Sequence, residues 1–243
     1  MARSSHEGGH TFRAYRALLL LSLVLGVGCT GLSPVYSVSV SGKYKVRSGD
    51  TLYSIAFRHG LDYRSLAKIN GISPPYMIYP DEVLHLRGSA KAPQTDQGPP
   101  NGSTSSSTKI APTKYDLPSS VALWSWPVKG EIISRFSMVK PINNGIDIAA
   151  KEGEFVKAAA EGVVVYAGGN LRGYGKLLII KHTNDFLSAY GNNAALLVSE
   201  GDEVKAGRSI ARVGSGSDTQ QILHFEIRRD GKPVDPSGLL PSP

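Results

Sequence analysis

The chain holds a single cysteine, Cys29, so it has no pair of cysteines that could form a disulfide within one molecule. Its apolar run Ala17–Val27 is shorter than the roughly 20 residues that an ordinary membrane-spanning helix needs. No basic stripe with interleaved aromatic residues and no zinc-finger spacing appears, and we therefore expect no nucleic-acid partner. These absences argue against a disulfide framework, a spanning anchor and a nucleic-acid module.

The composition is that of a globular chain with a modest basic excess. The 243 residues are enough for one or two domains, and the apolar fraction of 41% suits two cores only if both are small. The formal charge of +7 falls to about +5 if a leader carrying Arg3, Arg13, Arg16 and Glu7 is removed. Such an excess favours anionic cell-wall polymers or an acidic partner, or is simply a soluble basic surface.

The first 28 residues have the pattern of an export signal. Arg13 and Arg16 precede the apolar run, which ends in small residues just before Cys29. This segment resembles a bacterial lipoprotein signal, although Gly26 stands where that signal usually has Leu. The resemblance implies that Cys29 is acylated and becomes the new N-terminus, with plain cleavage or a buried thiol as alternatives.

By analogy with such lipoproteins, Thr30 after the cysteine favours an outer-membrane anchor facing the periplasm over the inner membrane. Stable anchoring generally takes more than one acyl chain, and bacterial lipoproteins carry several.

Residues 43–87 predict a small unit of strand, helix, helix and strand. Tyr44 and Val46 alternate as a short strand, and Asp50 can cap the helix that begins at Thr51. Gly60 ends that helix. Asp62 can cap a second helix, which Asn70-Gly71 stops, and Val83 to Leu86 reads as the closing strand. The fold class expected here is a small α+β unit of βααβ order.

These residues resemble a LysM domain, a module that binds N-acetylglucosamine-containing glycans such as peptidoglycan. The resemblance covers 43–87, with Asp81 in place of the usual turn glycine. It implies a glycan-binding groove between two loops, formed by Gly49, Asp50, Thr51, Leu52, Ile78, Tyr79 and Pro80. The alternative is that Asp50 only caps the helix and Ile78 only packs.

Residues 88–123 predict a flexible linker. The segment is polar, with Pro, Gly, Ser and Thr at its centre, so it has too little apolar surface to offset the entropy of ordering. About thirty residues of such a chain have a mean span on the order of 30 Å. We expect a tether between two folded parts.

Residues 124–241 predict a mainly antiparallel β domain. Short runs rich in β-branched and aromatic residues alternate with Gly and Asn clusters. The expected strands are Val163 to Tyr166, Leu177 to Ile180, Phe186 to Tyr190, Ser209 to Val213 and Leu223 to Ile227.

Three short motifs in this domain resemble those of lysostaphin/LytM-type endopeptidases, which read H-x-G-x-D, Y-x-H and H-x-H-F-E. Here they read Asn143-Asn144-Gly145-Ile146-Asp147, Tyr190-Gly191-Asn192 and Ile222-Leu223-His224-Phe225-Glu226. The resemblance implies the duplicated hybrid motif type of fold. It also implies that Asn143 stands for a zinc ligand, that Asn192 and Ile222 stand for proton-transfer histidines, and that only Asp147 and His224 remain.

These replacements predict a domain with no catalytic residue, no metal and no cofactor. A catalytic zinc usually has three protein ligands, and a neutral amide is a poor substitute for imidazole. Ile222 cannot carry a proton, and the amide of Asn192 does not titrate near neutrality. Two alternatives remain open: a residual weak metal site at Asp147 and His224, and an enzyme with the unusual ligand set Asp147, His224 and His182.

The order of signal, LysM module, linker and degenerate LytM domain resembles the NlpD-type murein hydrolase activator lipoproteins. The resemblance implies a non-catalytic activator of periplasmic N-acetylmuramoyl-L-alanine amidases, which split septal peptidoglycan so that daughter cells separate. Its groove would bind the partner through Asn143, Asp147, Arg172, Tyr174, Tyr190, Asn192, Ile222 and His224. The alternatives are the zinc endopeptidase and a purely structural lipoprotein that ties membrane to wall.

Overall fold

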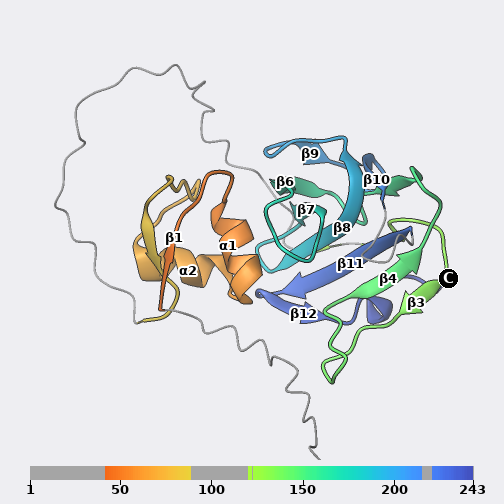
Figure 1. The fold of residues 1–243 in the computed structure, drawn as a ribbon, viewed down its shortest axis with the longest axis horizontal. Helices are drawn as coiled ribbons and strands as arrows, with labels where there is room; N and C mark the ends of the chain where they lie inside the picture. The colour runs from red at the N-terminus through yellow and green to blue at the C-terminus, as the bar shows by residue number, and fades with distance from the viewer. Residues whose placement is uncertain (1–41, 89–119, 122, 215–220, 243) are drawn as a thin grey trace, which may run out of the picture. The chain divides into compact units, whose positions relative to one another are not determined.

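The computed structural model describes residues 42–88, 120–121, 123–214 and 221–242, which Figure 1 draws in colour. The leader, Cys29 and most of the predicted linker lie outside the described residues. Among the residues described, no helix is long and apolar enough to cross a membrane. All of these residues belong to one unit of the chain, which begins at Ser39.

The predicted βααβ unit is confirmed. Its elements are β1 (Lys43–Lys45), α1 (Leu52–His59), α2 (Tyr63–Asn70) and β2 (Val83–His85). The two strands pair antiparallel, with Tyr44 opposite Leu84. A small apolar core fills the space between helices and strands; it consists of Val46, Leu52, Ile55, Ala56, Tyr63, Leu66, Ala67, Leu84 and Leu86.

The helix ends follow the predicted signals except at one residue. Asp62 caps α2 by accepting from the Ser65 N–H, and Gly60 and Gly71 end α1 and α2 in the left-handed conformation. The prediction that Asp50 caps α1 is wrong, because Thr51 forms a capping box with Ser54.

The Asp50 carboxylate is used inside the module instead. It accepts from the Tyr44 hydroxyl at 2.7 Å and from the Arg47 N–H at 2.9 Å, and it pairs with Arg58 at 3.1 Å. Its side chain is almost fully buried. Asp50 therefore stabilises the loop before α1.

Asp81 lies in a backbone conformation that suits glycine. Its φ is +71°, and its exposed carboxylate pairs with Lys45. Any Cβ is penalised there by about 1 kcal/mol. Both Asp81→Gly and Asp81→Ala lose the ion pair, but only alanine keeps a Cβ. We therefore expect the free energy of unfolding of Asp81→Gly to be about 1 kcal/mol higher than that of Asp81→Ala. Urea unfolding of the two variants measures the difference, and the same pair of substitutions at Glu82, which has a negative φ, should not favour glycine.

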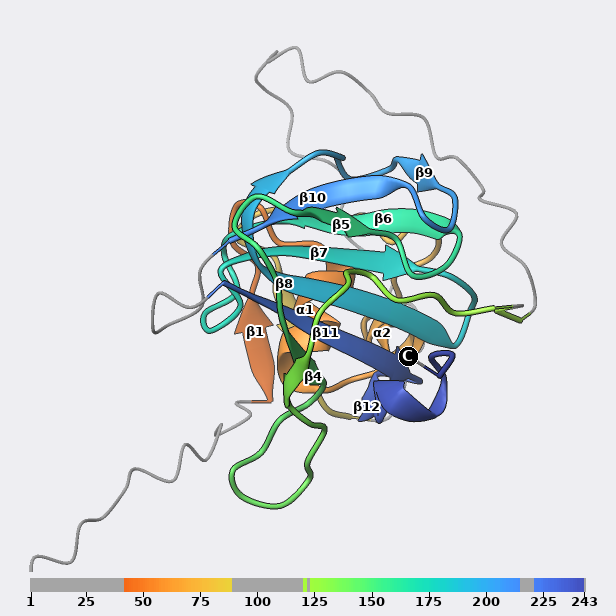
Figure 2. The same cartoon turned by 90° about the vertical axis from the view of Figure 1, so that its right-hand side faces the viewer.

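The predicted antiparallel β domain is also confirmed, and every strand pairing in it is antiparallel. Its strands are β3 (Ile132–Ser134), β4 (Ile146–Ala149), β5 (Phe155–Lys157), β6 (Gly162–Gly168), β7 (Lys176–Lys181), β8 (Phe186–Leu196), β9 (Glu203–Val204), β10 (Ser209–Val213), β11 (Ile222–Arg229) and β12 (Lys232–Val234). A 3-10 turn, Pro236–Gly238, follows. Figure 2 shows β6, β7, β8 and β11 side by side, in the order given by their pairing.

Both faces of the central strands are buried. Leu178, Ile180 and Tyr190 belong to the main core of the domain, on one face of the sheet. Their neighbours in sequence, among them Leu177 and Ile179, belong to a second apolar cluster on the opposite face. We call the face that carries this second cluster the outer face.

Candidate functional site

The register of three strands brings the motif residues together. His224 on β11 lies opposite Asp147 on β4 and opposite Gly191 on β8. Because side chains alternate along a strand, His224, Glu226 and Arg228 share one face of β11, whereas Leu223, Phe225 and Ile227 enter the main core. The sheet therefore presents a row of three polar side chains on its outer face.

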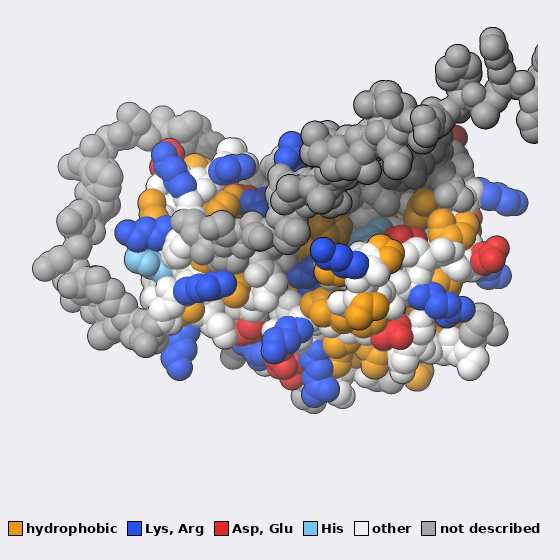
Figure 3. Space-filling model, turned by 60° about the horizontal axis from the view of Figure 1, so that its bottom comes forward, with side chains coloured by type: hydrophobic (Ala, Val, Ile, Leu, Met, Phe, Trp, Pro, Cys, Tyr) orange, Lys and Arg blue, Asp and Glu red, His pale blue; other side chains and the backbone are white. Residues whose placement is uncertain are grey.

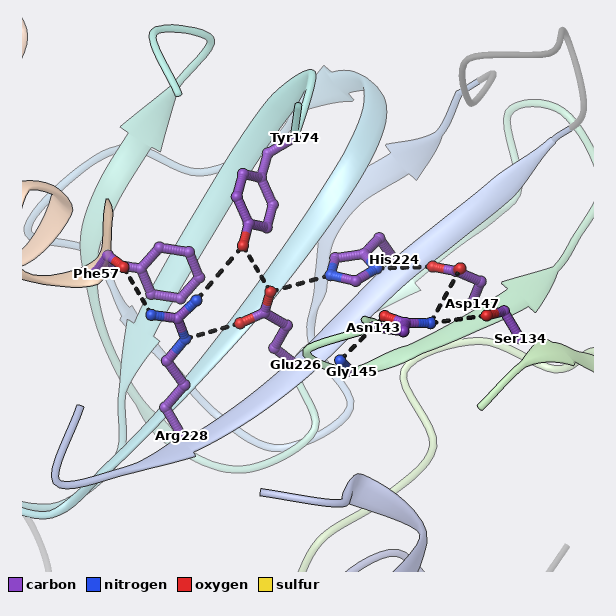
Figure 4. Close-up of polar contacts among 9 residues, drawn as sticks. All are labelled: Phe57, Ser134, Asn143, Gly145, Asp147, Tyr174, His224, Glu226 and Arg228. Atoms are coloured by element: carbon purple, nitrogen blue, oxygen red, sulfur yellow. Dashed lines mark hydrogen bonds and ion pairs between the residues drawn. The ribbon is translucent and has the colours of Figure 1, made fainter. Parts of the chain in front are cut away.

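These side chains form a continuous chain of polar contacts, which Figure 4 shows. The His224 Nδ1 lies 2.7 Å from the Asp147 Oδ1, and its Nε2 lies 3.0 Å from the Glu226 Oε1. Glu226 also accepts from the Tyr174 hydroxyl at 2.7 Å, and its Oε2 accepts from the Arg228 Nε at 2.7 Å. The Arg228 Nη1 donates to the backbone carbonyl of Phe57 at 2.6 Å, so the chain of contacts reaches the βααβ module.

Asn143 extends the chain at its other end. Its Nδ2 donates to the Ser134 Oγ at 2.9 Å and to the Asp147 Oδ2 at 3.2 Å, while its Oδ1 accepts from the Gly145 N–H at 3.2 Å. The reverse amide orientation would place its oxygen beside a carboxylate oxygen. The network thus points the amide nitrogen at Asp147.

The electrostatics of the row favour a charged imidazole between two carboxylates. Burial alone would lower the pKa of His224, but hydrogen bonds to Asp147 and Glu226 and their negative charges raise it to about 9. Burial would raise the pKa of Glu226, yet the contacts with His224 and Arg228 hold it below its ordinary value. At neutral pH both ring nitrogens of His224 therefore donate, one to each carboxylate.

His224 and Glu226 of the polar row line an open cavity of about 430 Å³, which we call the groove. The predicted residues Asn143, Asp147, Tyr174, Asn192 and His224 line it. Sequence reasoning missed the other lining residues, which are Ser134, Pro141, Ile142, Asn144, Gly173 and Glu226. The predicted Arg172 and Ile222 are not among the lining residues.

Tyr190 does not face the groove, and its prediction as a partner-binding residue is wrong. Its side chain is fully buried in the main core, where its hydroxyl accepts from the Ala159 N–H at 2.8 Å. Tyr190 lies opposite Phe225 rather than His224, so its ring points to the inner side of the sheet.

His182 also lies away from the groove. Its ring is fully buried, with Nδ1 2.6 Å from the Glu161 carbonyl and Nε2 2.6 Å from the Ser188 Oγ, and it packs edge-on against Trp124. Both ring nitrogens are therefore occupied by Glu161 and Ser188, and neither contacts Asp147 or His224. The structure does not assemble the alternative ligand set of Asp147, His224 and His182.

The predicted glycan loops of the βααβ module differ in exposure. Tyr79 is 66% exposed and Pro80 is exposed, whereas Leu52 is buried in the core and Asp50 is held by its intramodule contacts. Gly49 is exposed, and Thr51 and Ile78 are half-buried. A broad open hollow lies beside these loops and is lined by residues 43–48, Pro80 and Asp81.

Two family models match the chain. The LysM domain matches residues 44–87, and peptidase family M23 matches residues 141–236. A solved structure of Helicobacter pylori Csd3 is 32% identical with a TM-score of 0.45, covering 50% of this chain and 35% of that one.

Curated relatives match over most of the chain. A lipoprotein NlpD/LppB homolog of Pseudomonas aeruginosa is 46% identical over 230 residues, covering 83% of this chain and 77% of that protein. The uncharacterized lipoprotein YgeR of Escherichia coli K12 is 39% identical, covering 92% of each. The murein hydrolase activator NlpD of the same organism is 35% identical, covering 84% and 69%.

Proposed function

Because the chain belongs to the NlpD/LppB family of lipoproteins, which combines a LysM and an M23 domain, we propose that it activates a murein hydrolase without cutting peptidoglycan itself. The hydrolase that we infer is a periplasmic N-acetylmuramoyl-L-alanine amidase. Its activation would promote the splitting of septal peptidoglycan and the separation of daughter cells. The observation that carries the proposal is the match to relatives named murein hydrolase activator over most of their length.

The donors in the groove support a non-catalytic role, because they do not suit a zinc ion. Both ring nitrogens of His224 already contact a carboxylate, Asp147 at 2.7 Å and Glu226 at 3.0 Å, so neither nitrogen is placed to ligate an ion without giving up one of these contacts. The Asn143 Nδ2, which cannot ligate, points at Asp147, and Ile222 offers no proton. In the described part of the chain, no group of three or more His, Cys, Asp or Glu side chains is placed to hold a metal ion.

The rim of the groove supports binding to a protein partner. The loop between β3 and β4 carries three exposed apolar side chains, Met138 at 62%, Val139 at 76% and Ile142 at 60% exposure, and of these Ile142 lines the groove. Figure 3 turns the lower side of Figure 1 forward and shows hydrophobic side chains gathered there with basic ones beside them. Exposed apolar side chains that adjoin a polar groove are typical of an interaction surface.

Such a groove activates a partner if it binds the partner's open state more tightly than its closed state. Asn143, Asp147, Tyr174, Asn192 and His224, with the apolar rim, are the residues that we propose to contact the amidase. Arg172 and Ile222 are proposed only as neighbours of this surface.

The remaining parts would hold the protein at the wall. We propose that the leader of residues 1–28 is removed, that Cys29 is acylated, and that the anchor lies in the outer membrane facing the periplasm. Relatives named outer membrane antigenic lipoprotein B support this placement. The LysM module, 43–87, would bind peptidoglycan at Gly49 to Leu52 and Ile78 to Pro80, and the linker, 88–123, would join it to the domain at 124–241.

A dye-release assay on labelled peptidoglycan tests the proposal. The full chain alone should release no dye, whereas the chain added to an amidase should raise release at least tenfold over the amidase alone. Ile142→Asp should abolish most of this stimulation, because it places a charge on the apolar rim. Leu197→Asp is the matched control, since Leu197 is 44% exposed and is not a lining residue of the groove.

The same assay identifies the alternatives. Release by the chain alone, with stoichiometric zinc, would indicate an endopeptidase and would overturn the proposal. If the chain binds peptidoglycan but stimulates none of the periplasmic amidases of the source organism, the result would favour the purely structural lipoprotein.

A further inference from the structure

Helix α1 of the LysM module covers the outer face of the M23-like sheet. Phe57 is 3% exposed, yet it is not part of the LysM core. Its ring belongs to the second apolar cluster instead, with Tyr166, Leu171, Leu177, Ile179, Leu187 and Ala189. The Phe57 side chain is therefore buried by the contact between the two modules.

Polar contacts fix this docking at its edge. Arg64 of α2 pairs with Asp185 at 2.9 Å and with Asp230 at 2.7 Å. The backbone of the β11–β12 turn approaches the turn between the helices so closely that a Cβ on Gly231 would lie 2.3 Å from the Leu61 carbonyl oxygen. The Lys181 ammonium lies 4.9 Å from the centre of the Tyr63 ring. The two modules therefore meet at one surface where opposite charges pair, the backbones fit closely and apolar side chains are buried.

The docking also uses the loop to which we assign glycan binding. The Thr51 hydroxyl donates to the Val165 carbonyl on β6 at 3.1 Å. The Asn170 amide lies so near Gly49 that a Cβ at that glycine would be 2.7 Å from its Nδ2. One of the two predicted glycan-binding loops is thus in contact with β6 and the loop after it.

We propose that this docking and the binding of a glycan strand at the Gly49–Thr51 loop exclude one another. A sugar that takes the Thr51 hydroxyl and stacks against the loop would need the space and the hydrogen bond that Val165 and Asn170 now occupy. Glycan binding then releases the M23-like domain from the LysM module. The inference rests on the proposed peptidoglycan-binding role of this loop.

Arg228 connects this exchange to the groove. Its guanidinium lies 3.4 Å from the centre of the Phe57 ring and donates to the Phe57 carbonyl, while its Nε holds Glu226. The Phe57 ring also packs edge-on against Tyr174, which lines the groove. Undocking removes these contacts and leaves Arg228 with Glu226 and Tyr174 alone, so the polar row of the groove is held differently in the glycan-bound chain.

Calorimetric titration of the full chain with a hexamer of N-acetylglucosamine tests the inference. Arg64→Glu places a carboxylate beside Asp185 and Asp230 and should undock the modules without touching a proposed glycan residue. If the docked form holds about nine-tenths of the chains, undocking should tighten binding on the order of tenfold. The triple variant Arg64→Glu, Asp185→Lys and Asp230→Lys restores opposite charges and should return the affinity to that of the parent.

Small-angle scattering and amide exchange at α1 report docking in each variant. Phe57→Asp serves as a second undocking variant, since Phe57 lies outside the LysM core. Equal affinity of docked and undocked chains overturns the inference, as does the absence of sugar binding in both. Amidase stimulation is scored separately, so its loss in the parent chain would remove the proposed activator function without deciding this exchange.

Discussion

Replacing Arg228 by methionine should lower the free energy of unfolding by about 3–5 kcal/mol, the usual cost of breaking a buried ion pair. Arg228 is 4% exposed, and its partner Glu226 is fully buried. Methionine keeps much of the apolar stem but leaves the Glu226 carboxylate with His224 and Tyr174 as its remaining partners among the described residues. Urea unfolding at pH 7 measures the loss.

Arg229→Met is the matched control for this prediction. Arg229 is the next residue of the same strand, is exposed, and forms no ion pair with another described residue, so its replacement should change stability by less than about 0.5 kcal/mol. Adding Glu226→Gln to Arg228→Met should recover part of the loss, because it removes the uncompensated charge. Similar losses for Arg228→Met and Arg229→Met would contradict the role given to the buried pair.

The βααβ module was the most predictable part of the chain because its signals are local. Gly60 and Gly71 end helices through a backbone conformation that few other residues adopt, and Asp62 caps α2. The sequence predicts the cap of α1 one residue too early, because Asp50 is a good capping residue in isolation whereas Thr51 is the cap. Arg58 and Tyr44, which lie six or more residues away in sequence, take its carboxylate for another purpose.

In the antiparallel β domain, the expected strands match longer strands such as β7 and β8, whereas the short strands β3 and β5 are not among them. Leu177 to Ile180 lies within β7, but β3 and β5 have only three residues each and alternate between exposed and half-buried or buried positions. β4 begins inside the motif that ends at Asp147, so the same residues belong to a strand and to the site. Such short strands form because neighbours in the sheet supply their hydrogen bonds.

The groove residues that belong to a recognisable motif were predicted. Those indicated only by the alternation of polar and apolar residues were missed. Asp147 and His224 meet as expected, because the strand register places them opposite each other. The polar residues at 224, 226 and 228 alternate with apolar ones, which was a usable signal for the row that contains Glu226 and Arg228. The same alternation sends Tyr190 into the core.

One feature of the sequence also indicates that the outer face of the sheet is covered. Leu177 to Ile180 does not alternate between apolar and polar residues, so both faces of β7 had to be buried. The sequence of this strand does not predict that Phe57, more than a hundred residues earlier in the chain, covers one of those faces. Long-range partners of this kind are fixed by tertiary packing and not by local pattern.

Acidification should weaken the fold through His182. Burial lowers the pKa of His182 from 6.5 to about 4, and the Glu161 carbonyl offsets only part of that effect. Since the carbonyl can only accept, the Nδ1 carries the proton of the neutral ring and the Nε2 accepts from Ser188. Between pH 6.5 and 4 the unfolded chain binds more protons than the folded chain, so stability is lost as the pH falls. A shift of this size corresponds to about 3 kcal/mol.

The contribution of His182 is isolated by comparison with His182→Gln, which is neutral at every pH. That variant should be less stable than the parent at pH 7, but its stability should fall less steeply between pH 6.5 and 4. Urea unfolding at half-unit pH steps gives the difference between the two curves, in which the carboxylates common to both chains cancel. Parallel curves would mean that His182 titrates normally in the folded chain, and its burial between Glu161 and Ser188 would then carry no linkage to pH.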